Sequence, residues 1–247
     1  MRAERFSRLR LLYGAEALAR LASSSVAVVG IGGVGGYAAE ALARSAVGRL
    51  TLIDFDVVAP SNINRQVHAL EGTLGRAKVQ VMAERCQAIH PEIEVEPIKA
   101  FFSAENAAIL LSSGVDAVLD CIDTVTAKLL LIETCWKRGL PVFSSMGAAG
   151  KVDPTAIAVA DLFDTRNCHL ARILRKELRK RGVGPGVTVV YSREGCRGNG
   201  GGQLRAEAGE PHSPRRRPTL GSSSYIPPLF GLTLAGEVLR RLTEEDL

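Results

Sequence analysis

Closely spaced glycines follow the first apolar run of the sequence, Ser25–Val29. Gly30, Gly32, Gly33 and Gly35 fit the pattern G-x-G-G-x-G and precede a stretch with helical periodicity. Glycines placed between a strand and a helix permit a tight turn and let a phosphate approach the amides at the start of the helix. The segment therefore predicts a nucleotide-binding loop.

A carboxylate follows at the distance expected for a ribose contact. Asp54 ends the next apolar run, about 20 residues after the glycines, where it can accept hydrogen bonds from ribose hydroxyls. Taken alone, the glycines and Asp54 favour an oxidoreductase that uses a nicotinamide dinucleotide.

The polar residues that come next favour a nucleoside triphosphate instead. A triphosphate carries more charge than a dinucleotide, so it needs additional cationic donors and a carboxylate that binds a metal. Asp123 ends a later strand, where it can hold Mg²⁺ or, alternatively, cap the helix that follows. The remaining candidates are Asp56, Ser61, Asn62, Arg65, Gln66 and Lys78.

These residues need a scaffold that gathers them. Strands are predicted over 25–29, 50–54, 93–99, 115–119 and 141–144, and helices over 34–46, 75–90, 125–138 and from 103 onward. This alternation is typical of βαβ units, whose parallel strands end at one edge and bring the glycines, Asp54 and Asp123 together. We therefore predict an α/β fold: a doubly wound, Rossmann-like, mostly parallel sheet with helices on both faces and a C-terminal elaboration.

The pattern weakens after about residue 150. Strands are predicted over 155–161 and 187–191, a basic helix over 168–181, a mobile loop over 195–218 and a last helix over 229–242. We expect one domain, 1–247, in which an N-terminal helical segment (1–24) precedes a nucleotide-binding core (25–150) and the C-terminal elaboration (151–247).

The positive charge of the chain is confined to one segment. The 247 residues carry a net charge of +5, yet residues 166–217 hold 13 Lys and Arg against 4 Asp and Glu. Arginine outnumbers lysine by 24 to 7 in the whole chain, which suits forked contacts to phosphate. A solvated surface and a phosphate-binding surface both explain this segment.

Composition excludes several other classes of protein. No run of about 18 apolar residues is present, so we expect no membrane-spanning helix. The five cysteines form no C-x-x-C pair, so we expect neither disulfides nor zinc, and a cytoplasmic location. Cys168 precedes the basic helix, whose N-terminus favours a thiolate, although a small apolar role is the simpler explanation.

Taken together, the motifs resemble the ubiquitin-activating-enzyme-like superfamily of adenylating proteins, which includes the activators of thiamine and molybdopterin sulfur carriers. The resemblance rests on the glycine motif, D-x-D at Asp54, S-N-x-x-R-Q at Ser61, G-x-x-K at Gly75 and D-x-x-D at Asp120. It implies that the chain binds ATP and Mg²⁺ and drives attack of a carboxylate on the α-phosphate.

The resemblance also implies a role for individual residues. Asp54 would contact the ribose, Asp123 would hold the metal, and the phosphates would be bound by Asn62, Arg65 and Lys78. The segment Arg5-Phe-Ser-Arg8 is similar to an N-terminal R-x-x-R motif whose second arginine reaches the nucleotide of the partner subunit. Arg8 is therefore a candidate catalytic residue that acts in trans in a homodimer; a solvated helix charge is the alternative.

One branch of the superfamily matches nearly the whole chain. The chain resembles the bacterial tRNA threonylcarbamoyladenosine dehydratases in residues 63–70, 81–85, 89–91, 146–154, 170–178 and 221–227. This resemblance implies ATP-dependent activation of the free carboxylate of the threonylcarbamoyl group on adenosine 37 of tRNA, followed by cyclisation with loss of water. An intramolecular nucleophile then needs no enzyme thiol.

An RNA substrate gives the basic segment a role, because RNA binding needs phosphate contacts. A monovalent cation and a sulfur-transfer or cysteine-desulfurase-type protein are further candidates for binding. Two other functions stay open: activation of a ubiquitin-like sulfur carrier, which the missing zinc cysteines disfavour, and a non-catalytic or NAD-binding role. The candidate RNA-binding residues are Arg172, Arg175, Lys176, Arg179, Lys180 and Arg181, with a loop patch at Arg215, Arg216 and Arg217.

Overall fold

The computed structural model describes residues 2–111, 114–195 and 220–244. Two predictions fall outside these ranges: the loop over 195–218, apart from its first residue, and the patch at Arg215–Arg217. Among the described residues, no helix is both long enough and apolar enough to span a membrane.

A seven-stranded sheet forms the centre of the described part, in the order β3-β2-β1-β4-β5-β7-β6. Neighbouring strands are parallel except for β6, which runs antiparallel to β7. Val29 pairs with both Ile53 and Asp120, so β1, β2 and β4 end at one edge, here called the carboxyl edge. The strands are β1 (Ser25–Val29), β2 (Arg49–Ile53), β3 (Glu94–Ile98), β4 (Ala117–Asp120), β5 (Val142–Ser145), β6 (Ile157–Asp161) and β7 (Thr188–Ser192).

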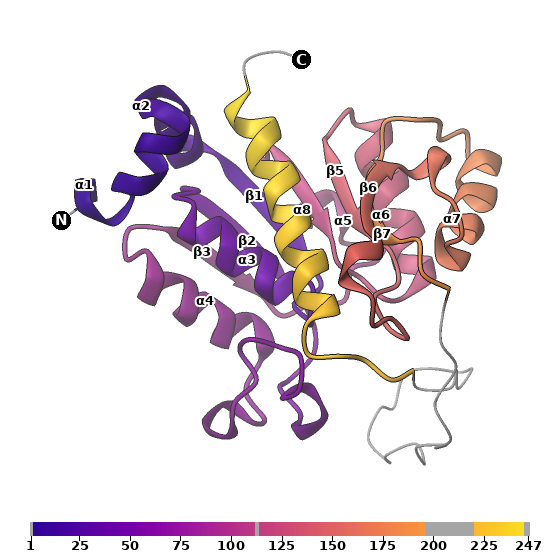
Figure 1. The fold of residues 1–247 in the computed structure, drawn as a ribbon, viewed down its shortest axis with the longest axis horizontal. Coiled ribbons are helices and arrows are strands. Elements are labelled where there is room, and N and C mark those ends of the chain that lie inside the picture. Colours follow the sequence, from indigo (N-terminus) through magenta and orange to yellow (C-terminus); the bar gives the residue numbers. More distant parts are fainter. Residues whose placement is uncertain (1, 112–113, 196–219, 245–247) are drawn as a thin grey trace.

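Helices cover both faces of this sheet (Figure 1). One face carries α3 (Gly35–Arg44), α4 (Lys78–Ile89) and α8 (Ile226–Thr243), and the other carries α5 (Ala107–Leu110), α6 (Val125–Lys137) and α7 (His169–Lys180). The N-terminal helices are α1 (Arg2–Arg5) and α2 (Ser7–Ser23). Short 3₁₀ turns are η1 (Pro60–Asn62), η2 (Glu71–Thr73), η3 (Pro154–Ala156) and η4 (Leu162–Asp164).

Alternate residues of the central strand β1 belong to different cores. Val26 and Val28 pack with α3, α4 and α8, whereas Ala27 and Val29 pack with α6 and α7. Successive side chains of a strand point to opposite faces, so a strand buried on both faces must be apolar throughout. The sheet is therefore covered twice, and the predicted fold class is confirmed.

Two element boundaries differ from the sequence-based expectation, each for a local reason. The helix predicted from Gly75 begins at Lys78, because residues 75–78 instead hydrogen-bond with residues 56–58: Gly75 donates to Val58, and Lys78 to Asp56. The helix predicted from residue 103 is only the four-residue α5, because Asn106 folds back and donates to the carbonyl of Phe101.

The last helix, α8, packs beside α3, the helix that follows the glycine-rich loop (Figure 1). It begins earlier than expected because prolines fit the first turn of a helix, whose N–H groups have no intrahelical partner. A Cβ on Gly231 would lie 2.2 Å from the carbonyl oxygen of Val34, the N-cap residue of α3. Glycine therefore lets α8 and the start of α3 approach closely.

Candidate active site

The glycine-rich loop joins the end of β1 to the start of α3 at the carboxyl edge. Gly30 has a φ of +93°, and a Cβ there would lie 2.7 Å from the carbonyl oxygen of Cys121. A Cβ on Gly35 would lie 1.8 Å from the carbonyl oxygen of Gly30. Neither position accepts a larger residue, so the loop packs directly on the segment that follows β4. The first turn of α3 then presents its amides to this edge, as an anion site requires.

Asp54 fixes the start of this loop from the end of β2. Its Oδ2 accepts a hydrogen bond of 2.6 Å from the amide of Ile31, and its Oδ1 accepts one of 2.8 Å from the amide of Asp56. Burial raises the pKa of Asp54 above its ordinary value, and the charge of Lys78 opposes that shift. The carboxylate thus organises the loop, and its remaining lone pairs can serve the predicted ribose contact.

Lys78 reaches the site through an ion pair that the backbone prepares. The pairing of residues 56–58 with 75–78 sets the side chains of Asp56 and Lys78 next to each other, and Lys78 Nζ lies 2.8 Å from Asp56 Oδ2. The lysine side chain is buried, whereas the carboxylate is partly exposed. The ammonium is therefore held beside the loop, where a phosphate can compete with Asp56 for it.

In the segment around η1, Asn62 helps to build the turn, whereas Arg65 is the candidate site residue. Asn62 is buried, and its Oδ1 accepts a hydrogen bond of 3.0 Å from the amide of Ala59, so it closes the turn. Arg65 donates through Nη1 to the carbonyl of Ser61 at 2.8 Å. Gln66 is buried, and its Oε1 has no partner among the described residues.

Arg65 and Asp123 come from opposite sides of the glycine loop. Burial lowers the pKa of Arg65, and the charge of Asp123 opposes this shift, so the two side chains interact. A Cβ on Gly33 would lie 3.2 Å from the carbonyl oxygen of Arg65, which places this arginine against the loop. A guanidinium, an ammonium and a carboxylate therefore lie near the glycine loop, where a phosphate is predicted to bind.

Asp123 is also the candidate ligand for Mg²⁺. Its carboxylate is exposed, and Thr124 donates to its Oδ1 at 3.3 Å. Within the described ranges, no group of three or more His, Cys, Asp or Glu could hold a metal ion. Mg²⁺ is commonly bound by one or two carboxylates, with phosphate oxygens and waters completing the shell. The single carboxylate of Asp123 fits this arrangement.

Sequence motifs missed two buried polar groups next to the site. The side chains of Asp120, Lys128 and Ser144 are joined under the end of β4, although only Asp120 belongs to a quoted motif. His68 is 1% exposed and lies against α3: a Cβ on Gly36 would be 3.1 Å from its Nδ1. In the sequence, Lys128 and His68 both stand among apolar residues. An ionisable side chain within an apolar stretch is the only signal that distinguishes them.

The described cysteines do not form a nucleophilic centre. Burial raises the pKa of the thiols of Cys86, Cys121 and Cys135 to about 12, which disfavours the thiolate. Cys168 instead accepts a 3.5 Å hydrogen bond from the amide of Ala171, as the N-cap of α7.

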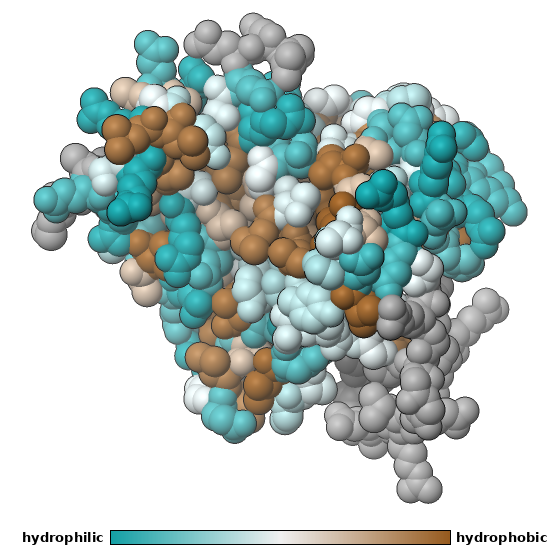
Figure 2. Space-filling model, viewed as in Figure 1, coloured by the Kyte–Doolittle hydropathy of each residue, from teal (hydrophilic) through white to brown (hydrophobic). Residues whose placement is uncertain are grey.

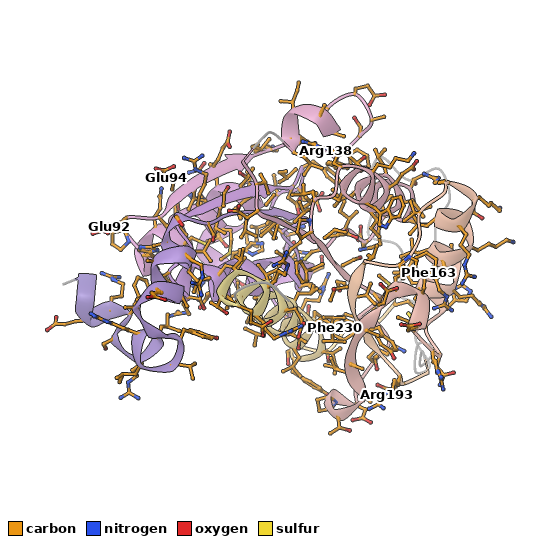
Figure 3. The ribbon with its side chains drawn as sticks, turned by 90° about the horizontal axis from the view of Figure 1, so that it is seen from above. Glu92, Glu94, Arg138, Phe163, Arg193 and Phe230 are labelled. Atoms are coloured by element: carbon orange, nitrogen blue, oxygen red, sulfur yellow. The ribbon has the colours of Figure 1, made fainter. Side chains whose placement is uncertain are left out.

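The basic helix α7 lies beside β6 and β7, where the surface is strongly hydrophilic (Figures 1 and 2). Arg175 is half-buried and donates to the carbonyls of Leu162 and Thr165, so it holds the preceding loop and is not free for RNA. The guanidinium of Arg179 lies 5.2 Å from the ring centre of Phe163. This contact uses one face of the guanidinium and leaves its edge exposed. Phe163 is labelled in Figure 3, beside the C-terminal helices and strands of the sheet.

The remaining basic residues in and after α7 differ in whether their side chains already form ion pairs within the chain. Lys180 pairs with Glu177 at 2.9 Å, and Arg181 pairs with Glu133 of α6 at 2.9 Å. The described part of the chain supplies neither a hydrogen bond nor an ion pair to the side chains of Arg172 and Lys176. These two exposed residues are four positions apart, so they share one face of the helix.

Arg8 lies on α2, far from the carboxyl edge of its own chain. Its neighbour Arg5 donates to the carbonyl of Ile89 at the end of α4, and Phe6 contacts the ring of His90 edge-on at 5.0 Å. Lys78 stands at the other end of α4, and a helix of 12 residues spans about 18 Å. Arg8 is therefore not brought together with Lys78, Arg65 and Asp123 within one chain.

Comparison with known proteins shows which enzymes the chain resembles. A Bacillus subtilis tRNA threonylcarbamoyladenosine dehydratase is 41% identical over 97% of this chain and 95% of its own length. Crystal structures of the E. coli tRNA N6-threonylcarbamoyladenosine dehydratase in complex with ATP and with AMP each match with a TM-score of 0.87 and 38% identity, over 97% of this chain and 94% of theirs.

A more distant relative matches about half of the chain. The E. coli molybdopterin-synthase adenylyltransferase is 37% identical over 54% of this chain and 52% of its own length. The model of the ThiF family matches residues 6–247, which is almost the whole sequence. The chain therefore belongs to the ThiF family.

Proposed function

We propose that this chain is an ATP-dependent tRNA threonylcarbamoyladenosine dehydratase, a ligase-type enzyme that works in the cytoplasm, where ATP and tRNA are found. It activates the free carboxylate of the threonylcarbamoyl group on adenosine 37 as an acyl-adenylate. The observation that carries the proposal is the convergence of Arg65, Lys78 and Asp123 on the glycine loop, in a chain that matches a dehydratase over 97% of its length.

The chemistry follows from the charges at the carboxyl edge. A carboxylate oxygen of the substrate attacks the α-phosphorus of ATP, the bond to the β-phosphate breaks, and pyrophosphate leaves. A nucleophilic atom of the same threonylcarbamoyl group then attacks the acyl carbon. AMP leaves with the former carboxylate oxygen, and the nucleophile loses its proton to solvent. The net change in the nucleoside is the loss of one water.

Lys78 and Arg65 supply positive charge where negative charge develops at the phosphates. When bound, Mg²⁺ would supply further charge stabilisation, with Asp123 as its protein ligand. The glycine amides at the start of α3 position the phosphate chain, and Asp54 keeps that loop in shape. The second step is intramolecular, which agrees with the absence of a low-pKa thiol among Cys86, Cys121 and Cys135.

A mass shift of the modified nucleoside tests the proposal. Incubation with ATP, Mg²⁺ and tRNA that carries threonylcarbamoyladenosine should lower the nucleoside mass by that of one water, and omission of ATP should prevent this. Lys78→Ala should lower kcat/KM by at least about 10²-fold while the thermal unfolding midpoint stays near that of the wild type. An unchanged nucleoside under conditions in which the wild-type protein binds ATP would reject the dehydratase assignment.

The alternative acceptor is the C-terminus of a ubiquitin-like sulfur carrier. The partial match to the molybdopterin-synthase adenylyltransferase supports the shared adenylation step but covers only half of this chain. Pyrophosphate exchange into ATP that depends on a carrier ending in Gly-Gly, and does not respond to tRNA, would favour this alternative.

The homodimer remains part of the proposal, with Arg8 reaching the nucleotide of the partner. Leu11 and Leu12 of α2 are 88% and 72% exposed and follow Arg8 by three and four positions, so the three side chains share a helix face. Large apolar side chains exposed together mark a contact surface. Figure 2 shows apolar surface at the position that α2 occupies in Figure 1. A second copy covering this face would carry Arg8 to another site.

A further inference from the structure

A buried ion pair lies under the candidate site without taking part in it. Lys128 Nζ is 2.7 Å from Asp120 Oδ2, and the hydroxyl of Ser144 donates to the same oxygen at 2.6 Å. All three residues are fully buried. Replacing a buried pair with apolar side chains is often neutral or stabilising, so these charges point to a role other than stabilising the fold.

The ion pair joins the two ends of a short segment of chain that contains Asp123. Asp120 ends β4, and its Oδ1 accepts a 3.2 Å hydrogen bond from the amide of Ile122. Lys128 lies in the first turn of α6, where its amide donates to the carbonyl of Thr124 at 3.0 Å. Both ends of residues 121–124 are thus tied to one ion pair, and Ser144 links that pair to β5.

Residues 121–124 contribute to the site in two ways, through a backbone carbonyl and through exposed side chains. The carbonyl of Cys121 is the group against which Gly30 packs, so a displacement of this carbonyl would disturb the glycine loop. Asp123 and Thr124 project from the same segment as exposed side chains. Lys128 itself is inaccessible and cannot touch a substrate.

We propose that Lys128 and Asp120 are positioning residues, which hold residues 121–124 so that the carboxylate of Asp123 meets the metal-bound nucleotide without reorganisation. The inference deepens the proposed function and rests on it only for ATP as the ligand. A segment held in place in advance loses no conformational freedom when the ligand binds.

A charge-free variant tests this role. Lys128→Met alone leaves the carboxylate of Asp120 buried without its cation and can fail to fold, so the informative protein is Lys128→Met/Asp120→Asn. We expect it to fold and to bind ATP in EDTA as the wild type does. The gain in ATP affinity on addition of Mg²⁺ should fall at least tenfold, and amide exchange of residues 121–128 should accelerate at least tenfold.

Two controls separate positioning from a purely structural role. Lys137→Met breaks an exposed ion pair on the same helix, with Glu133, and should change neither measurement. Lys128→Arg keeps the charge and should retain most of the Mg²⁺ effect. In an Asp123→Asn background, the double substitution should cause no further loss of Mg²⁺-dependent affinity, because its effect passes through Asp123.

Three results would overturn the proposal: a double variant that does not fold, a folded one with the Mg²⁺ effect and exchange rates of the wild type, or losses that add to those of Asp123→Asn. These measurements need no tRNA, so they remain decisive if the dehydratase assignment fails. If the wild type binds no ATP, the proposed function fails and the exchange rates alone decide about the ion pair.

Discussion

At the scale of single residues, His68 is an ionisable side chain buried next to the site. It is buried between the first turn of α3 and two cations, and neither ring nitrogen has a partner among the described residues. Burial, with the charges of Lys78 and Arg85, lowers the pKa of His68 to about 4. The imidazole therefore stays neutral at physiological pH and adds no charge beside Lys78 and Arg85.

This neutral histidine makes stability depend on pH in a defined direction. Between pH 6.5 and 4 the unfolded chain binds a proton at His68 and the folded chain does not, so stability falls as pH decreases through this window. From pH 7.5 to pH 5 this residue alone should remove about 2 kcal/mol from the free energy of unfolding.

Urea unfolding of wild type and His68→Leu at these two pH values measures the effect, and the variant should lose about 2 kcal/mol less. His169→Gln, at an exposed position of α7, is the matched control and should follow the wild type. Equal pH dependence in all three proteins would mean that His68 does not resist protonation.

Individual site residues were predictable to different degrees. The placement of Asp54 and Asp123 at the carboxyl edge was predictable, because motifs keep a fixed spacing to strand ends and parallel strands end at one edge. Lys78 was predictable as a neighbour of that edge for the same reason. The role of Asn62 in closing the turn was not predictable, because an amide that binds phosphate and one that accepts a backbone hydrogen bond look identical in sequence. The pairing of Lys128 with Asp120 depends on the first turn of α6 lying back over β4, which no local pattern specifies.

At the scale of elements, the contact between α8 and α3 makes two glycines of one helix behave in opposite ways. Gly231 lies against the carbonyl of Val34, whereas a Cβ on Gly236 would have no heavy atom within 4 Å. Gly236→Ala should raise the free energy of unfolding by about 0.5–1 kcal/mol, because alanine loses less conformational entropy in a helix.

Gly231→Ala should instead destabilise the protein, because the new methyl group forces α8 away from the start of α3. Since that turn carries the glycine loop, ATP affinity should fall as well. Chemical unfolding and ATP titration of both variants provide the measurement; the same sign of stability change at both positions would contradict the packing argument.

The basic helix α7 yields a second prediction at this scale. Arg172 and Lys176 are the members of the predicted RNA surface whose side chains make neither a hydrogen bond, nor an ion pair, nor a ring contact with the described residues. Arg172→Glu/Lys176→Glu should weaken tRNA binding and reduce the slope of log affinity against log salt by about 1 for each phosphate that the protein no longer neutralises. ATP affinity should not change.

Filter binding at several salt concentrations measures this slope. Arg240→Glu/Arg241→Glu changes the net charge equally at exposed positions of α8, and it should alter tRNA affinity much less. Equal weakening in the two proteins would indicate that net charge alone attracts the RNA, with no particular surface on α7.

Elements were easier to predict than their ends. Buried strands and amphipathic helices leave a periodic pattern, and the sheet followed from it. The start of α4 was misplaced because residues 75–77 pair with a segment some twenty positions earlier, and hydrogen bonds between distant segments leave no periodic trace.

At the scale of the whole molecule, the proposed homodimer, in which Arg8 acts in trans, makes activity depend on the partner. Arg8→Ala and Lys78→Ala should each be inactive, but co-expression should restore about a quarter of the wild-type activity, because half of the dimers are mixed and each has one complete site. Co-expressed Lys78→Ala and Asp123→Ala serve as the control and should recover nothing, since both residues belong to one chain's site. Failure of the first pair to recover would exclude Arg8 acting in trans.

The approach of α8 to α3 has a consequence for biosynthesis. The glycine loop and Lys78 belong to the first third of the chain, yet Gly33 rests near Pro227, and Gly231 abuts Val34. While the ribosome is still making the C-terminal segment, the loop lacks this support, so a nascent chain should hold ATP poorly. The last helix should thus delay nucleotide capture until the C-terminal segment has been made and has folded.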